Sequence, residues 1–463
     1  MMLQVHTFMR SGLVLVMVLG LVWVAAPALA ASDDEERLQA LEREVAELKA
    51  AIAELRDLGL AEDRLAEVER RLGLLAEEIE DLKVGEAAVA AMTVESGEPY
   101  GLGPAAAKVY QKDQGVSIGG YGEALLQLYD DEKDDGDSSG KVDQFDFLRA
   151  VLYVGYKFSD SWVLNTEIEF EHASSSEGGS VSVEFAYLDY LHSDQFNLRA
   201  GLVLLPMGWL NELHEPTVYL GATRPRTESV IIPTTWRENG VGAWGELGAF
   251  DYRTYVVNGL DATGFSAKGL RGGRQKGARA KAKDFAWVGR LDFTGVPGLV
   301  VGASGYIGDS GQNLVDAAGG SIQVGTTIVD LHAEYRSRGL RLRGLYSQAT
   351  LDDVAELNQA LGYSGVQSVG EKLEGGYLEA GYDFLSGSGS RSLIPYVRWE
   401  RLNTQLEVPV GWSANPANDQ KLLTLGLAYQ PISQLIFKAE YLNVDNQAGT
   451  GVDQFNLALG YIF

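Results

Sequence analysis

Cysteine is absent from this chain of 463 residues, and histidine occurs only five times. Without cysteine the protein has no disulfide bond, no thiol nucleophile and no thiolate ligand for a metal ion. Beyond the first thirty residues the histidines are His172, His192, His214 and His332. Enzymes that depend on cysteine are therefore excluded, and we expect no catalytic residue, no metal site and no cofactor.

A long apolar run occurs only near the amino terminus, from Leu13 to Val24. It is shorter than the roughly 20 residues that a membrane-spanning helix needs. It follows Arg10 and precedes the small-residue end Ala28-Leu29-Ala30, which is the pattern of a secretory signal peptide. We expect residues 1–30 to be a signal peptide. Any later membrane-spanning segment would have to be a strand.

Basic residues are fewer than acidic ones. The chain has 38 Lys and Arg and 64 Asp and Glu, and its net charge is −26. A nucleic acid would be repelled by a protein of this charge. We therefore expect no nucleic-acid partner.

Heptad spacing is present in residues 31–83. Leu38, Leu41, Val45, Leu48 and Ile52 follow one another at intervals of three and four residues, and a second block repeats the pattern. This spacing predicts a coiled coil. A single amphipathic helix is the alternative. Residues 84–115 are rich in Ala and Gly with isolated Pro, which predicts a linker.

From residue 116 to Phe463 the apolar residues recur at every second position, as in Leu423, Leu425 and Leu427. This period predicts strands with one apolar face. Short turns such as Val296-Pro297-Gly298 alternate along the chain with longer polar connections. The pattern predicts an all-β transmembrane barrel of about 16 antiparallel strands over 116–463, preceded by the coiled coil. A soluble β-sandwich is the alternative.

Aromatic residues lie near the ends of the expected strands, for example Tyr156, Phe158, Tyr441 and Tyr461. Aromatic side chains at both borders are typical of a barrel in a lipid bilayer. We therefore expect a bacterial outer-membrane location, with both termini and the coiled coil in the periplasm.

Charged residues occupy the other face of the strands, where they would face the lumen. A barrel of this size is too wide for its own side chains to fill, so the lumen should hold water. The basic residues expected to line the pore are Arg149, Arg199, Arg290, Arg341, Arg343, Arg398 and Lys438. Some of them could instead pair with acids on neighbouring strands.

The longest ordered connection is expected between Pro206 and Arg237. Long loops in compact domains are more often functional than idle, and the apolar residues of this one need a surface to pack on. We expect it to fold into the lumen, with capping of the barrel or contact with another subunit as alternatives. Its constriction residues would be Arg224, Arg226, Arg237, His214 and Glu215.

A basic loop follows in an otherwise acidic chain. It carries Lys268, Arg271, Arg274, Lys276 and Arg279 with almost no acids. Such a patch could draw anions towards the mouth of the pore or pair with lipopolysaccharide phosphates. A merely solvated loop is the third reading.

These features together resemble the phosphate-selective porin O and P family, in particular the stretch from Asn211 to Gly240 and the patch Arg271-Gly272-Gly273-Arg274. The resemblance implies a homotrimer in outer-membrane lipid that passes small anionic solutes passively, with a weak anion preference. The function expected is that of a porin and not of an enzyme.

Two other functions are compatible with the sequence. The coiled coil could tether the outer membrane to the cell wall, since about fifty helical residues would extend roughly 75 Å. Alternatively the barrel could be a hydrolase that uses His214 beside Glu215. Adjacent residues seldom face one another, which disfavours the second alternative.

Overall fold

The computed structural model describes residues 101–176, 178–387 and 391–463. The predicted signal peptide (1–30), the coiled coil (31–83) and most of the predicted linker lie outside these residues and stay predictions. Among the described residues no helix is long and apolar enough to cross a membrane.

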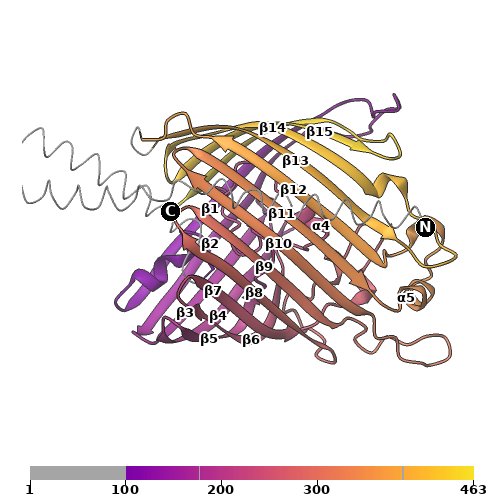
Figure 1. Cartoon of the computed structure of the whole chain (residues 1–463), viewed down its shortest axis with the longest axis horizontal. Helices are drawn as coiled ribbons and strands as arrows, with labels where there is room; N and C mark the ends of the chain where they lie inside the picture. Colours follow the sequence, from indigo (N-terminus) through magenta and orange to yellow (C-terminus); the bar gives the residue numbers. More distant parts are fainter. Residues whose placement is uncertain (1–100, 177, 388–390) are drawn as a thin grey trace, which may run out of the picture. The chain divides into compact units, whose positions relative to one another are not determined.

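The described residues form one closed barrel of sixteen antiparallel strands, as predicted (Figure 1). Each strand pairs with its neighbours in the sequence, and β1 closes the ring on β16, with Tyr121 opposite Ile462. The strands are β1 (Gly115–Tyr129), β2 (Gln144–Ser159), β3 (Trp162–Glu171), β4 (Ser180–Ser193), β5 (Phe196–Leu204), β6 (Arg237–Glu246), β7 (Phe250–Asn258), β8 (Phe285–Val296), β9 (Leu299–Asp309), β10 (Gly325–Ser337), β11 (Leu340–Leu351), β12 (Lys372–Tyr382), β13 (Ser392–Glu407), β14 (Asp419–Ile432), β15 (Leu435–Asn446) and β16 (Gln454–Ile462).

The described chain also has short helices, which are η1 (Ala106–Gln111), α4 (Thr227–Val230), η2 (Ala262–Gly264), η3 (Arg271–Gly273), α5 (Val354–Ala360), η4 (Gly365–Gln367) and η5 (Pro416–Asn418). Of these, η1 precedes β1 and the others lie in the connections between strands. Two-residue turns such as Arg338–Gly339, which joins β10 to β11, lie at one rim, and the longer loops lie at the other. This alternation is the one that the sequence predicts for an outer-membrane barrel.

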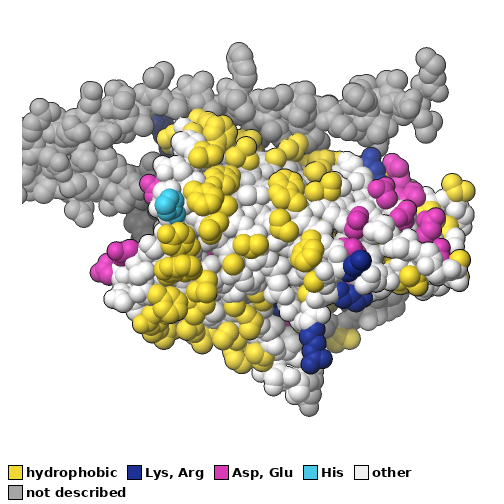
Figure 2. Space-filling view, turned by 90° about the horizontal axis from the view of Figure 1, so that it is seen from below, with side chains coloured by type: hydrophobic (Ala, Val, Ile, Leu, Met, Phe, Trp, Pro, Cys, Tyr) yellow, Lys and Arg dark blue, Asp and Glu magenta, His cyan; other side chains and the backbone are white. Residues whose placement is uncertain are grey.

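The outer face of the barrel is apolar. On β14, Leu423, Leu425 and Leu427 are between 39% and 52% exposed, whereas Thr424 between them is buried. Figure 2 shows apolar side chains spread over one side of the barrel, with acidic and basic side chains gathered towards its ends. Exposed aromatic residues border this surface, including Phe158 and Phe463 near the short turns. This arrangement suits a surface bathed in hydrocarbon and bordered by lipid headgroups.

The inner face carries the polar positions of the same strands. On β3, Asn165, Glu167 and Glu169 are at most 2% exposed, while Phe170 points outward. The main apolar core lies inside the barrel, where Trp209 and Trp236 of the connection between β5 and β6 are fully buried. The lumen is therefore filled largely by folded chain.

The end of the predicted linker is part of this filling. Residues 101–111, which include η1, lie against the inner sides of β1, β2 and β3. Asn165 on β3 donates to the carbonyl oxygen of Ala106 at 2.9 Å, and the Tyr110 hydroxyl donates to Asp189 on β4 at 2.6 Å. The sequence predicted a linker up to residue 115, but most of residues 101–110 are buried and the segment is hydrogen-bonded to the wall, whereas residues 111–114 are exposed. Its alanines fit closely against the wall, a role that composition does not reveal.

Candidate functional site

The third of the long loops, residues 205–236 between β5 and β6, folds into the lumen as predicted. We call it the lumen loop. Its apolar residues Ile231 and Ile232 belong to the core cluster, and its short helix α4 packs on β12 and β13. The loop thus narrows the barrel from within.

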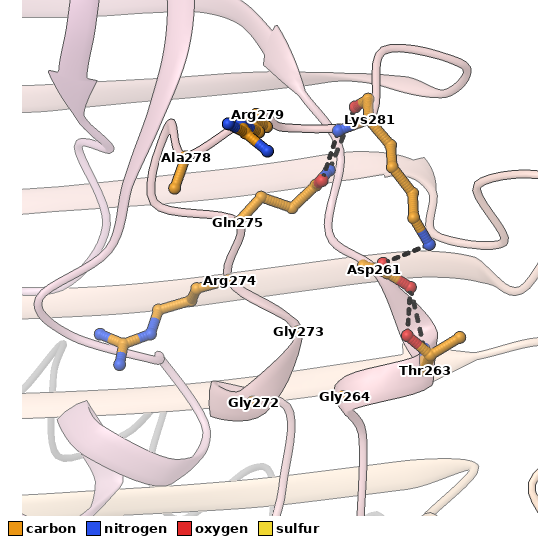
Figure 3. Close-up of a pocket in the computed structure, with 10 residues that line it drawn as sticks. All are labelled: Asp261, Thr263, Gly264, Gly272, Gly273, Arg274, Gln275, Ala278, Arg279 and Lys281. Atoms are coloured by element: carbon orange, nitrogen blue, oxygen red, sulfur yellow. Dashed lines mark hydrogen bonds and ion pairs between the residues drawn. The ribbon is translucent and has the colours of Figure 1, made fainter.

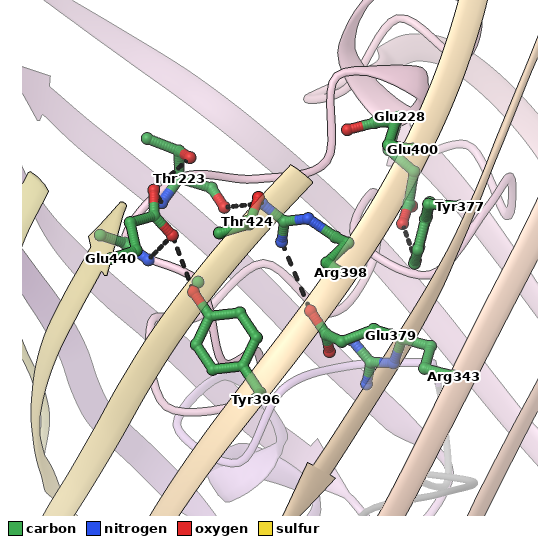
Figure 4. Close-up of polar contacts among 12 residues, drawn as sticks. Thr223, Glu228, Arg343, Tyr377, Glu379, Tyr396, Arg398, Glu400, Thr424 and Glu440 are labelled. Carbon is green, nitrogen blue, oxygen red and sulfur yellow. Dashed lines mark hydrogen bonds and ion pairs between the residues drawn. The ribbon is translucent and has the colours of Figure 1, made fainter. Parts of the chain in front are cut away.

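Carboxylates on the wall hold the backbone of the lumen loop. Glu440 on β15 accepts hydrogen bonds from the amides of Ala222 and Thr223 at 2.9 and 3.1 Å, and from the Thr223 hydroxyl (Figure 4). Glu400 on β13 accepts from the amides of Arg226 and Thr227 at 3.0 and 2.5 Å. Charge-assisted bonds of this kind are stronger than neutral ones, so these two acids fix the course of the loop.

The lumen loop also carries an acid of its own for the same purpose. Glu228 accepts from the amides of Trp209 and Leu210 at 2.7 Å each, and from the hydroxyl of Tyr377 on β12 at 2.6 Å. These bonds close the loop on itself and attach it to the wall. They explain how a buried carboxylate is tolerated.

Most of the predicted pore-lining basic residues face the lumen but lie beneath the loop. Arg149 is partly buried, with a side chain 14% exposed, and Arg199, Arg290, Arg341, Arg343, Arg398 and Lys438 are between 2% and 9% exposed. The expectation that these last six line a water-filled lumen is therefore wrong for this structure. The lumen loop and segment 101–111 occupy the space that the barrel's width would leave to water.

The partners of these basic residues are acids of the wall and carbonyl oxygens of the loop. Arg341 and Arg343 each reach Glu334 at 3.0 Å, and Arg341 also donates to the carbonyl oxygen of Val218 at 2.6 Å. The Lys438 ammonium donates to the carbonyl oxygen of Gly221 at 2.8 Å. The remaining pairs are Arg199 with Asp189, Arg290 with Asp292, Arg398 with Glu379, and Arg149 with Glu123 and Glu169.

The five predicted constriction residues divide into two sets. Arg237 is buried and pairs with Glu184 on β4 at 2.7 Å, and His214 and Glu215 are buried as well. Arg224 and Arg226 keep part of their surface exposed. They contact uncharged groups, since Arg224 donates to the carbonyl oxygen of His214 and Arg226 donates to the amide oxygen of Gln420.

His214 and Glu215 have different partners, although they are adjacent. The His214 ring faces Glu167 at 3.2 Å, whereas Glu215 accepts from the amides of Ala105 and Ala106 at 3.0 Å each. Burial raises the pKa of Glu215 to about 7 against the pull of these two amides. The geometry uses Glu215 to hold segment 101–111 and gives it no contact with the histidine ring.

The basic loop, residues 259–284 between β7 and β8, lies beside the lumen loop. Arg274 donates to the carbonyl oxygen of Thr235 at 2.6 Å, and the loop closes on itself through Asp261 and Lys281 at 2.7 Å (Figure 3). A hollow of about 310 Å³ within it is lined by Asp261, Thr263, Gly264, Gly272, Gly273, Arg274, Gln275, Ala278, Arg279 and Lys281. Of the predicted basic residues in this loop, Arg274 is half-buried and Lys268, Arg271, Lys276 and Arg279 are exposed.

Positive charge gathers where the two loops meet. Burial, together with the neighbouring Arg271 and Arg237, lowers the pKa of Arg274 to about 9. Arg271 keeps part of its surface exposed, but partial desolvation by the surrounding loops lowers its pKa to about 10, with Arg224 contributing in the same direction. Arginines that destabilise one another's charge mark a region of positive potential, which an anion would relieve. We call Arg224, Arg271, Arg274 and Lys276 the basic vestibule.

The sequence did not reveal a cluster of buried ion pairs around His332, which lies under the lumen loop. His332 on β10 contacts Asp330 at 2.6 Å through Nδ1 and Asp292 at 2.7 Å through Nε2, and Arg290 also pairs with Asp292. Alternation places Asp330, His332 and Asp292 on the inner face. The sequence carries no signal that β8 and β10, which are not adjacent strands, bring these side chains together.

Comparison with known proteins places the chain in a family. No family model matches the sequence. A protein of Aquifex aeolicus (strain VF5), described as an uncharacterized protein, is 35% identical over 386 residues, which cover 80% of this chain and 85% of that protein. The chain belongs to the family of this Aquifex aeolicus protein.

Solved structures share the barrel. Salmonella typhi OmpF in a complex with daunomycin matches with a TM-score of 0.51 and 13% identity, covering 77% of this chain and 99% of OmpF. An anion-selective porin from Comamonas acidovorans matches with a TM-score of 0.47 and 12% identity, covering 76% of this chain and 100% of that porin. At 13% identity the match to OmpF concerns the barrel fold alone. Membership of the phosphate-selective porin O and P family stays a prediction.

Proposed function

We propose that this protein is an outer-membrane porin through which small hydrophilic solutes diffuse passively, with a weak preference for anions such as phosphate. The closed barrel with an apolar outer face supports residence in the outer membrane. The observation that carries the anion preference is the basic vestibule, in which four cationic side chains lie on the two loops at the mouth.

The vestibule favours anions for a simple electrostatic reason. Arg224 bonds to the carbonyl oxygen of His214, a contact that does not neutralise its charge. The basic residues deeper in the barrel are mostly paired with acids and contribute little net potential. Screening at physiological salt limits each charge to about 8 Å. A solute therefore responds to the local vestibule charges and far less to the chain's overall net charge.

The described conformation predicts a low conductance. The wall residues of the lumen are largely covered by the lumen loop and by segment 101–111, so only a narrow or transient route is left to solutes. We propose that the route follows the face of the lumen loop that carries Arg224 and Arg226. Movement of segment 101–111 would open its periplasmic end.

The test is a reversal-potential measurement on the purified full chain in a planar lipid bilayer, under a potassium chloride gradient. We expect small channels whose reversal potential has the sign of chloride selectivity. A potential that favours potassium would remove the anion preference, and the absence of any conductance would remove the porin function.

The sequence also suggests which partners this porin would have. We propose a homotrimer in outer-membrane lipid, with the exposed Lys268 and Arg279 of the basic loop available to lipopolysaccharide phosphates. The predicted coiled coil would lie in the periplasm and could contact the cell wall. Chemical cross-linking of whole cells should give a ladder that ends at three chains, and a ladder ending at two would exclude the trimer.

A further inference from the structure

Three buried side chains converge beneath the basic vestibule. His214 of the lumen loop places Nε2 3.2 Å from Glu167 Oε1 on β3 and 3.7 Å from Glu184 Oε2 on β4. All three residues are at most 2% exposed. Their ligand atoms lie within 4.8 Å of one another.

The other ring nitrogen of His214 fixes its tautomer. Nδ1 lies 2.9 Å from the carbonyl oxygen of Asn211, which can only accept a hydrogen bond. Nδ1 therefore carries a proton, and a neutral ring directs the lone pair of Nε2 at the two carboxylates. A backbone carbonyl behind the ring is the usual outer partner of a histidine that binds a metal ion.

Two carboxylate oxygens at this point have no hydrogen-bond partner. They are Glu167 Oε2 and Glu184 Oε2, although the other oxygen of Glu184 accepts from Arg237 and Thr235. A buried charged acceptor without a donor is unfavourable. These side chains thus form a buried group of acceptors suited to a cation.

The local charge also leaves room for a cation. Glu167, Glu184, Glu169 and Glu123 lie close together here, and the guanidinium groups of Arg237 and Arg149 pair with members of this set. The carboxylates outnumber the two guanidinium groups paired with them, and a bound cation would reduce that imbalance.

We propose that His214, Glu167 and Glu184 bind a divalent transition-metal ion, with Zn²⁺ as its representative. Ligand atoms about 2.0–2.1 Å from a tetrahedral zinc ion lie about 3.3–3.4 Å apart. The distances of 3.2 and 3.7 Å from Nε2 to the two carboxylate oxygens are close to this spacing. The mixed imidazole and carboxylate donors suit zinc and its neighbours in the first transition row, and a fourth position is left for water.

The other buried histidine, His332, lies in a cluster whose carboxylates do not need a metal ion. Both ring nitrogens of His332 face aspartates, at 2.6 and 2.7 Å, so a doubly protonated ring satisfies both carboxylates. His214 has only one nitrogen available and two carboxylates before it. The ion would join the lumen loop to β3 and β4, in addition to the bonds from the wall acids.

The experiment measures metal binding to the full-length protein in detergent after removal of metals with a chelator. Zn²⁺ is added at neutral pH, and the bound metal is counted by mass spectrometry after dialysis and its affinity is measured by calorimetry. We expect one Zn²⁺ per chain, with an affinity reduced at least about tenfold by E167Q and by H214Q. Exposed His172 supplies the matched control, H172Q, which should bind as the unaltered protein does.

A second measurement serves in case the variants fail to fold. Co²⁺ added to the unaltered protein should give the intense visible absorption of a tetrahedral nitrogen and oxygen site, and Zn²⁺ should abolish it. Failure to bind either metal would overturn the proposal and leave a proton on Nε2 as the counter-charge. Binding that E167Q leaves unchanged, or a weak octahedral cobalt spectrum, would also overturn it. These results do not depend on whether the barrel conducts ions.

Discussion

The lumen loop and the basic loop lie side by side at the same rim, both carry arginines, and wall acids hold them to different extents. The lumen loop is held by acids of the wall that accept from its backbone, as Glu440 does from Ala222 and Thr223. The basic loop is held by its own residues, among them Asp261 and Lys281, and also by neighbours such as Glu238 on β6, which accepts from the Gln275 amide at 2.7 Å. Buried wall acids therefore hold several backbone amides of the lumen loop and fewer of the basic loop, and exposed charge on both loops sets the potential that a solute meets.

The largest effect should come from removing a wall acid that holds the lumen loop. Glu440 is buried and accepts from the loop, from Tyr396 and from Asn456. We expect E440A to lower the free energy of unfolding by about 3–5 kcal/mol, because several buried donors lose their acceptor. Urea unfolding in detergent micelles would measure this change. The exposed Glu356 on α5 gives the control, E356A, which should change stability by less than about 0.5 kcal/mol.

The same substitution should also alter conduction. A lumen loop that has lost Glu440 is free to leave the wall, so E440A should give larger single-channel currents than the unaltered protein. Equal currents in the two proteins would mean that the loop does not limit passage.

A smaller effect should appear as a pH dependence of the unfolding free energy, which arises at the contact between the lumen loop and segment 101–111. Burial raises the pKa of Glu215 from 4.5 to about 7. The folded state then binds a proton that the unfolded state has released between these pH values, so stability falls as pH rises from 4.5 to 7. The loss should approach about 3 kcal/mol. Unfolding at pH 5 and pH 7.5 should show this slope in the unaltered protein and a flatter one in E215Q. Identical slopes would contradict the assignment to Glu215.

The smallest effect on stability should accompany a clear effect on selectivity. R224S removes a partly exposed charge of the basic vestibule and should change the unfolding free energy by less than about 0.5 kcal/mol. We expect the permeability ratio of chloride to potassium to fall roughly two- to fivefold, equivalent to about 0.4–1 kcal/mol. The exposed Arg279 at the edge of the basic loop supplies the control, R279S, with a smaller change. A larger shift for R279S than for R224S would place the selective region outside the vestibule.

Much of the barrel could be predicted from the sequence because alternation is a local property. The period of two distinguishes Leu423, Leu425 and Leu427 on the outer face from Thr424 on the inner face, and the short turns set the order of the strands. The inward course of the lumen loop could be predicted too, since apolar residues such as Ile231 and Ile232 need a surface to pack on.

The partners and the burial of the charged residues on the inner face could not be predicted in the same way. Alternation places Arg341 and Arg343 on the inner face but does not show that Glu334 and a loop carbonyl lie within reach. The convergence of His214 with Glu167 and Glu184 depends on how a loop meets two strands, and no spacing in the sequence records that contact. The buried role of residues 101–110 was hidden because an alanine-rich composition suits both a linker and close packing.

The position of the lumen loop can be tested directly, because the chain contains no cysteine. A side chain built at Gly375 on β12 would place its Cβ 2.9 Å from the Thr227 hydroxyl oxygen on α4, which puts the two Cβ atoms within the reach of a disulfide bond. We expect the double variant T227C/G375C to form an intramolecular disulfide upon oxidation in intact outer membranes. Two cysteines that stay reduced, with Thr227→Cys open to a membrane-impermeant maleimide from outside, would contradict a lumen loop held against the inner wall.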